Sequence, residues 1–345
     1  MTGRQTEAGA LPGVDLEVVV GWLGDAGLEV SAPLTGQRVG VGQSNLTYLL
    51  MDAAGRQWIL RRPPLGSLLQ SAHDVAREHR IMAALNRSAV PVPKVIGLWH
   101  DQTDQLLMDY VDGLVIDRME VAAGQSELVR AAAGRSIART LAEIHAVDLE
   151  RAGLLDLASH RPYAERQLKR WERQLEASKT RERPDLDRLT ARLRASVPAQ
   201  RELVLVHGDL HIRNVICAAG TGEVLAALDW ELSTLGDPIA DLGTLLAYWP
   251  EKADSSDWRF AASTLPGFPS QPELVDEYVL ATGRDIAALG FWHVLGVWKV
   301  AIIAEGIRQR FQGDARNAPT GGPPSPASID YLVDEAWELV DRYRI

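Results

Sequence analysis

The sequence predicts an α+β fold of two lobes, in which a small antiparallel sheet with one key helix precedes a larger, mainly helical part. Between residues 34 and 110, short apolar runs are separated by turn residues, a pattern typical of antiparallel strands. After Asp112-Gly113, apolar residues recur mostly at helical spacing. The 345 residues also exceed the roughly 250 to 300 over which a single core usually grows. We therefore expect two domains, at residues 1–111 and 112–345.

The first lobe should combine short strands with two helices. Turn residues such as Asp52-Ala-Ala-Gly55 separate its apolar runs. Its expected elements are a helix at 14–26, strands at 46–51 and 57–60, a helix at 73–85, and strands at 94–99 and 105–110.

The helix at 73–85 carries a carboxylate on an apolar stripe. Val75, Glu78, Met82 and Leu85 follow one another at 3-4-3 spacing and share one face. An unpaired charge on a buried face is costly, so Glu78 needs a cationic partner.

The second lobe should be mainly helical, with a few short extended segments at 203–206, 214–217 and 224–228. Residues 317–328 (NAPTGGPPSPAS) have the composition of a loop. The expected helices lie at 128–147, 163–177, 186–195, 238–248, 271–281, 285–310 and 327–342.

Composition excludes several classes of protein. The net charge of −10 and the absence of a long run of Lys and Arg argue against a nucleic-acid partner. Cys217 is the one cysteine, so there is no intrachain disulfide and no thiolate zinc cluster, and we interpret it as a buried, unreactive residue. The N-terminus lacks a secretory signal pattern, and no run of about 18 uncharged apolar residues occurs. We expect a cytoplasmic protein without a membrane partner.

Three oxygen-bearing side chains mark the candidate chemistry. In Val206 to Ile216 (VHGDLHIRNVI), an apolar strand leads to Asp209, and Asn214 follows five residues later. Asp229 ends the next extended run. Phosphoryl transfer requires an oriented hydroxyl and metal ions that offset charge on the phosphates. Hard oxygen ligands suit Mg²⁺, which assigns Asn214 and Asp229 to the metal and Asp209 to the acceptor hydroxyl.

The pattern H-G-D-x-x-x-x-N, followed by a strand and D-W-E, resembles the aminoglycoside phosphotransferase-like (choline kinase) branch of the protein-kinase-like superfamily. The resemblance covers nearly the whole chain and implies a bilobal kinase-like fold that uses ATP and Mg²⁺. It assigns to Asp209, Asn214 and Asp229 the same three roles. The simpler alternative is that these residues only cap helices and form turns.

The resemblance also implies a nucleotide site in the first lobe. Gly40, Gly42, Ser44 and Asn45 would form the turn that covers the phosphates, where glycines let backbone N–H groups approach closely. Glycines in a hairpin otherwise mean only a turn. The run from Leu107 to Gly113, which contains Met108, Asp109 and Tyr110, would be the hinge beside the adenine.

The family expects a basic residue on the third strand, paired with a helical carboxylate. Arg61 stands at that position in place of the usual lysine, and it keeps the charge that Glu78 needs. Strand alternation puts Ile59 on the same face, where it would contact adenine, whereas Arg62 points the other way and is expected to be a surface charge.

Several neighbouring residues have expected supporting roles. His207 should order the catalytic loop, and His211 should serve structure or the substrate edge, since no second histidine has metal-ligand spacing. Asp237 is an N-cap before Pro238. Asp241 either braces the catalytic loop or is a surface carboxylate, and Glu231 either assists near the metal or is solvated.

The substrate is expected to be a small hydroxylated molecule bound by the second lobe. Most of its tryptophans should be core: Trp249, Trp258, Trp292, Trp298 and Trp337. The segment from Arg61 to Arg80 is similar to the kinase-like domain associated with acyl-CoA dehydrogenases, which implies a hydroxyacyl compound or its CoA ester as acceptor.

The sequence leaves two alternatives open, one to the kinase activity and one to the acceptor. One is a nucleotide-binding regulatory protein without turnover, suggested by Arg61 in place of lysine. The other is an aminoglycoside, amino alcohol or sugar as acceptor. A kinase of polypeptides is disfavoured because no D-F-G, A-P-E or activation segment lies between Asp229 and Pro238.

Overall fold

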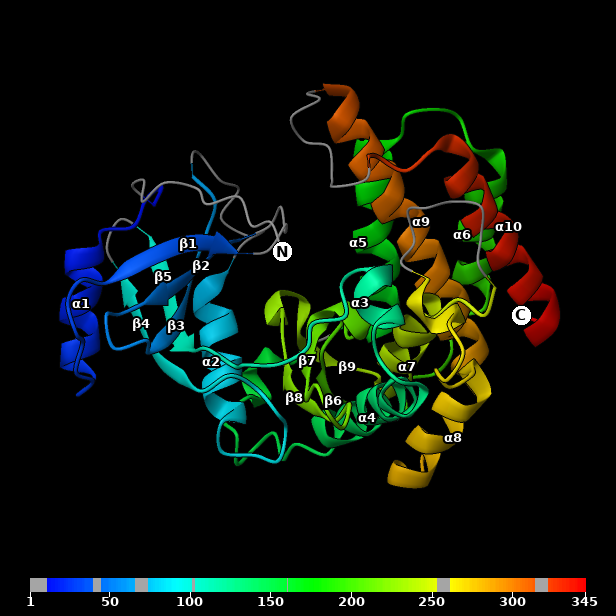
Figure 1. Cartoon of the computed structure of the whole chain (residues 1–345). Coiled ribbons are helices and arrows are strands. Elements are labelled where there is room, and N and C mark those ends of the chain that lie inside the picture. The colour runs from blue at the N-terminus through cyan, green and yellow to red at the C-terminus, as the bar shows by residue number, and fades with distance from the viewer. Residues whose placement is uncertain are drawn as a thin grey trace. The chain divides into compact units, whose positions relative to one another are not determined.

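The first part of the chain forms a five-stranded antiparallel sheet, as the alternating apolar runs predict (Figure 1). The computed structural model describes residues 11–39, 45–65, 74–100, 103–159, 161–252, 261–313 and 322–345. The strand order is β1-β2-β3-β5-β4. The strands are β1 (Thr35–Val39), β2 (Leu46–Met51), β3 (Gln57–Arg62), β4 (Val95–His100) and β5 (Asp104–Asp109).

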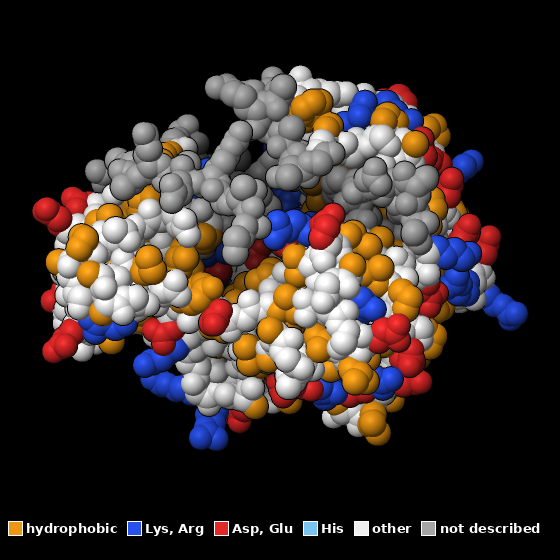
Figure 2. Space-filling view, viewed as in Figure 1, with side chains coloured by type: hydrophobic (Ala, Val, Ile, Leu, Met, Phe, Trp, Pro, Cys, Tyr) orange, Lys and Arg blue, Asp and Glu red, His pale blue; other side chains and the backbone are white. Residues whose placement is uncertain are grey.

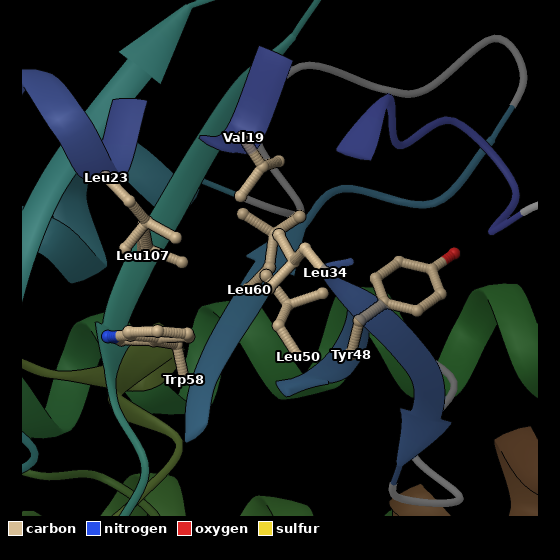
Figure 3. Packing of buried hydrophobic residues seen from close by; sticks show 8 residues of the cluster. All are labelled: Val19, Leu23, Leu34, Tyr48, Leu50, Trp58, Leu60 and Leu107. Atoms are coloured by element: carbon tan, nitrogen blue, oxygen red, sulfur yellow. The ribbon is translucent and has the colours of Figure 1, made fainter. Parts of the chain in front are cut away.

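Helix α1 (Leu16–Asp25) covers one face of this sheet. Its N-cap is Asp15, whose carboxylate accepts the Glu17 N–H at 2.9 Å. A cluster of buried residues joins the helix to the strands (Figure 3), and burial of such apolar side chains is the main stabilising term in a unit of this size. The cluster consists of Val19, Leu23, Leu34, Tyr48, Leu50, Trp58, Leu60 and Leu107.

Helix α2 (Val75–Leu85) packs against β4 and β5 on the other face. Asp74 caps it by accepting the Arg77 N–H at 2.9 Å. The predicted stripe is confirmed, since Val75, Glu78, Met82 and Leu85 are all buried.

Arg62 corrects one prediction. As strand alternation predicts, Arg62 points to the opposite face of the sheet from Arg61. That face is covered by the rest of the first unit, so Arg62 is buried and is not a surface charge. Its guanidinium donates to the carbonyl oxygens of Gly13 and Pro63. The long side chain therefore ties the segment before α1 to the end of β3.

The second part of the chain is mainly helical, and its described residues also form two small two-stranded sheets, β6 with β9 and β7 with β8. Its strands are β6 (Val204–Val206), β7 (Val215–Cys217), β8 (Val224–Ala227) and β9 (Thr234–Gly236). Its helices are α3 (Met119–Ala123), α4 (Glu127–His145), α5 (Tyr163–Ser178), α6 (Pro184–Ala195), α7 (Pro238–Ala247), α8 (Gln271–Thr282), α9 (Leu289–Gly313) and α10 (Pro326–Tyr343).

Helix α9 forms the centre of this part and packs against α5, α6, α7 and α10 (Figure 1). It crosses α7 through two glycines. A Cβ at Gly243 would lie 2.5 Å from the Trp292 carbonyl oxygen, and one at Gly296 would lie 2.8 Å from the Gly243 carbonyl oxygen. Only glycine permits this approach, which brings the backbones of α7 and α9 into direct contact.

Helix α9 is long and apolar enough to cross a membrane by composition alone, but 89% of its apolar window is buried inside the protein. That burial is the behaviour of a core helix. The predicted helix start at 285 is wrong, because Asp285 accepts the Ala287 N–H at 2.8 Å in a local turn and the helix begins at Leu289.

The chain divides into two compact units, Met1–Ser88 with Val92–Asp112 and Ala89–Pro91 with Gly113–Ile345. The boundary expected after residue 111 lies next to this division. On the visible face of the second unit, acidic and basic side chains are mixed among apolar ones, with no continuous basic band (Figure 2).

Candidate active site

The turn before Asp209 depends on glycine. Strand β6 ends at Val206, and Gly208 follows with a φ of +84°, a conformation that side chains with a Cβ rarely adopt. A Cβ on Gly208 would also lie 2.9 Å from the Leu232 carbonyl oxygen. Gly208, which has no side chain to take part in the chemistry, therefore sets the direction in which the chain continues from β6 to Asp209.

Asp241 makes the bracing contact with this turn. From the first turn of α7, its carboxylate accepts the N–H groups of His207 at 2.6 Å and Gly208 at 2.8 Å. His145 approaches it at 3.3 Å. Burial alone would raise the pKa of Asp241, but the His145 hydrogen bond, the nearby histidines and the Gly208 N–H together lower it below its ordinary value. Asp241 is therefore a buried carboxylate that braces the catalytic loop, and it is not a surface carboxylate.

Asp209 and Asn214 lie together, as their spacing in one tight loop predicts. The Asn214 amide donates to the Asp209 carbonyl oxygen at 2.9 Å and lies 3.4 Å from its carboxylate. Because the amide nitrogen faces Asp209, the amide oxygen of Asn214 is directed elsewhere. Asn214 can therefore offer that oxygen to a cation while its nitrogen orders the loop.

Asp229 reaches the same loop through its neighbour Leu228. The Leu228 N–H donates to the Asn214 carbonyl oxygen at 2.8 Å, and the Leu228 carbonyl oxygen lies 3.0 Å from His207 Nε2. Asp229 then adopts a left-handed conformation with φ of +67°. Aspartate tolerates this region better than most residues, yet such strain costs on the order of 1 kcal/mol and is concentrated at functional sites.

Lys299 is part of the site, and the sequence reasoning missed it. From α9, its ammonium donates to the Gly208 carbonyl oxygen at 2.7 Å and to Asp209 Oδ1 at 3.3 Å. Burial alone would raise the pKa of Asp209, but Lys299 and His211 hold it well below its usual range. The signal was available, because a lysine inside an apolar helix needs a partner just as Glu78 does.

The histidines around the loop have ordering contacts. His207 is fully buried against Trp230, accepts the Asp209 N–H through Nδ1 at 3.3 Å, and has its pKa lowered by burial. This neutral ring agrees with an ordering role. His211 Nε2 lies 3.7 Å from Asp209 Oδ2, and its ring packs on Tyr248.

Two acidic residues and the tryptophans complete the second unit's predicted set. Glu231 is half-buried in the short 3-10 turn after Asp229. Asp237 is an N-cap, as predicted, since it accepts the Ile239 N–H at 2.9 Å. Trp249, Trp292 and Trp298 are buried in the core, Trp337 is half-buried, and Trp258 lies outside the described residues.

The donor set fits Mg²⁺. Across the described residues, no group of three His, Cys, Asp or Glu side chains could hold a metal by itself. A site made of the Asn214 amide oxygen and the Asp229 carboxylate needs phosphate oxygens and water to complete it. Mg²⁺ is usually bound in this way, with one or two protein ligands beside a substrate phosphate.

In the first unit, Arg61 and Glu78 form the predicted pair. Arg61 Nε lies 2.9 Å from Glu78 Oε2, and the Glu78 side chain is almost fully buried. The register pairs Ile59 with Met108 and Arg61 with Leu106 across β3 and β5, so Ile59, Arg61 and Met108 share the face toward α2. The anomaly of a carboxylate on an apolar stripe is thus resolved.

The other predicted nucleotide residues are only partly described. Gly40, Gly42 and Ser44 lie outside the described residues, between the paired strands β1 and β2. Asn45 is buried, and within the described residues neither its amide nitrogen nor its amide oxygen has a hydrogen-bond partner. A buried amide in this state is costly and is suited to meet a polar ligand. In the hinge segment, the Asp109 N–H already donates to the Lys94 carbonyl oxygen, and Tyr110 is exposed.

Comparison with known proteins gives a consistent match. The model of the phosphotransferase enzyme family matches residues 35–292. Acyl-CoA dehydrogenase family member 10 of Mus musculus is 35% identical over 310 residues, covering 87% of this chain and 29% of the relative. Family member 11 of Rattus norvegicus is 32% identical over 299 residues, covering 83% and 38%. The chain therefore spans well under half the length of these relatives.

Solved structures agree on the fold. A protein assigned to the aminoglycoside phosphotransferases, from Ralstonia eutropha JMP134, is 28% identical, with a TM-score of 0.77 over 95% of this chain and 98% of the other. An amicoumacin kinase solved with AMP-PNP and Ca²⁺ is 17% identical with a TM-score of 0.58, over 95% and 94%. The bilobal kinase-like α+β fold is confirmed.

Proposed function

Because this chain belongs to the phosphotransferase enzyme family, we propose that it is an ATP- and Mg²⁺-dependent kinase that transfers the γ-phosphoryl group to a hydroxyl of a small molecule. The observation that carries this proposal is the braced loop on which Asp209 and Asn214 lie together. Arrays of this kind supply positioning and electrostatics, which phosphoryl transfer mainly requires.

Each polar side chain then has one task. Asn214 and Asp229 hold the cation, and Mg²⁺ when bound offsets charge on the phosphate oxygens. Asp209 accepts a hydrogen bond from the acceptor hydroxyl. Its lowered pKa keeps it ionised and makes it a weak base, so its main contribution is to orient that hydroxyl. Arg61, held by Glu78, binds nucleotide phosphate.

For the acceptor we propose a hydroxyacyl compound or its CoA ester. The names of the relatives support this class.

The test is a screen of hydroxylated acceptors with ADP release as the readout. The panel contains hydroxyacyl-CoAs, free hydroxy acids, sugars, amino alcohols and aminoglycosides. We expect Mg²⁺-dependent turnover with a hydroxyacyl compound, and loss of that turnover in Asp209→Ala while the circular dichroism spectrum is retained. Turnover only with an aminoglycoside would overturn the acceptor class. Binding of Mg-ATP without turnover on any acceptor would instead indicate a regulatory protein.

A further inference from the structure

Lys299 is a buried cation in an unusual setting. It lies near the middle of α9 and is only 4% exposed, between Trp298 and Val300, which are fully buried. A charge in such surroundings is costly unless paired and hydrogen-bonded. By contrast, Lys179 meets its acidic partners Glu182 and Asp187 near the surface. The position of Lys299 therefore calls for a specific reason.

The partners of Lys299 lie on either side of one peptide bond. Its ammonium donates to the Gly208 carbonyl oxygen and to the carboxylate of Asp209, and it packs on the Trp171 ring. The N–H of Gly208 is already held by Asp241 from α7. Gly208, the residue of the loop with the widest conformational freedom, thus has its N–H fixed from one helix and its C=O fixed from another.

The crossing of α7 and α9 makes this arrangement rigid. The two helices meet at Gly243 and Gly296, which lie two residues after Asp241 and three residues before Lys299. Direct backbone contact leaves little room for either helix to shift. Asp241 and Lys299 therefore act on the loop from one packed pair of helices.

We propose that Lys299 is a positioning residue that holds the Asp209 carboxylate in the orientation required for phosphoryl transfer. It acts through Asp209 and does not bind nucleotide. The inference rests on the proposed kinase function. It predicts that Lys299→Met, which keeps the length of the side chain but removes its charge, lowers kcat about 10- to 100-fold, the loss expected from misplaced reacting groups, while KM for Mg-ATP changes little.

The matched control is Thr190 of α6, which contacts Trp298, the residue before Lys299. The Thr190 hydroxyl accepts the Trp298 indole N–H at 3.0 Å and donates to the Leu186 carbonyl oxygen at 2.8 Å. Thr190→Val removes these buried bonds without touching Asp209. We expect Thr190→Val to lower stability but to leave kcat near that of the wild type.

A double-mutant cycle separates positioning from general damage. If Lys299 acts through Asp209, Lys299→Met will change the residual kcat by less than about twofold in an Asp209→Asn background, because groups that act as a unit are not additive. Additive losses, or a kcat in Lys299→Met equal to that of the wild type, would overturn the proposal. A rise in KM for Mg-ATP at constant kcat would do the same.

Hydrogen exchange tests the same contact without any turnover. In Lys299→Met, the amides of residues 206–216 should exchange faster than in the wild type, and in Thr190→Val they should not. Unchanged exchange of this segment in Lys299→Met would overturn the positioning role. If the wild type proves inactive with every acceptor, the proposed kinase function fails, and the exchange result still decides whether Lys299 orders the loop.

Discussion

Replacing Asp241 by Asn should destabilise the protein out of proportion to the size of the change. The carboxylate accepts from His207 N–H and His145 Nε2 through Oδ2, and from Gly208 N–H through Oδ1. An amide keeps one acceptor oxygen, so its NH₂ group must face at least one buried donor. A stranded donor costs about 1 to 3 kcal/mol, and loss of charge-assisted bonds adds to this. We expect a total of about 2 to 4 kcal/mol.

The assay is urea unfolding followed by tryptophan fluorescence and circular dichroism. A loss of this size is large against a typical stability of about 5 to 15 kcal/mol, but leaves a folded protein. Asp237→Ser is the matched control, because it changes a carboxylate on the same helix while retaining an N-cap hydroxyl, and it should cost only a few tenths of a kcal/mol. A loss below about 0.5 kcal/mol in Asp241→Asn, the range of ordinary surface substitutions, would refute the reasoning.

The same variant gives a pH signature of known sign. The pKa of Asp241 is lowered in the folded state, so its charge adds stability above the unfolded-state value of about 3.9, and that stability is lost as pH falls through the lower folded-state pKa. The stability difference between wild type and Asp241→Asn should be constant near neutral pH and shrink below about pH 4. A difference that instead grows on acidification would contradict the assignment.

Three further predictions follow from other residues. Arg61→Met should weaken Mg-ATP binding at least about tenfold by calorimetry, since charge-assisted hydrogen bonds contribute about 1.5 to 3 kcal/mol. The control Arg87→Met, at an exposed arginine, should leave Mg-ATP binding unchanged. Gly208→Ala should cost about 2 kcal/mol or more of unfolding free energy, from its positive φ and the close Leu232 oxygen, and a variant as stable as wild type would contradict this loop geometry. Burial raises the pKa of the Cys217 thiol to about 12, so a thiol reagent near pH 8 should modify the unfolded protein and leave the native one untouched.

Much of the site could be predicted because its signals are local. Five-residue spacing within one loop brings Asp209 and Asn214 together whatever surrounds them. Helical periodicity exposed Glu78 as a carboxylate that needed a cation, and strand alternation put Ile59 with Arg61 on one face. These inferences required no knowledge of distant packing.

The features that were not predicted depend on contacts between residues far apart in the sequence. Lys299 joins Asp209 from 90 residues away, so only the anomaly of a charge in an apolar helix could have indicated it. Strand β9 has three residues and exists because Thr234–Gly236 pairs with β6, a contact that no local pattern encodes. Arg62 was misassigned because strand alternation predicts which face of the sheet a side chain is on, but not whether that face is exposed or covered. The cytoplasmic location and the absence of a nucleic-acid or membrane partner stay predictions.

The central claim is that Asn214 and Asp229 hold a divalent cation that is bound to a nucleoside triphosphate. Calorimetric titration of ATP into the wild-type protein, with Mg²⁺ and then with EDTA, tests it most directly, and Asp229→Ala is the variant to compare. We predict binding that requires Mg²⁺ and weakens at least about tenfold in Asp229→Ala, equivalent to about 1.4 kcal/mol or more. Mg²⁺-dependent binding of equal strength in Asp229→Ala, or no binding of Mg-ATP by the wild type, would contradict it.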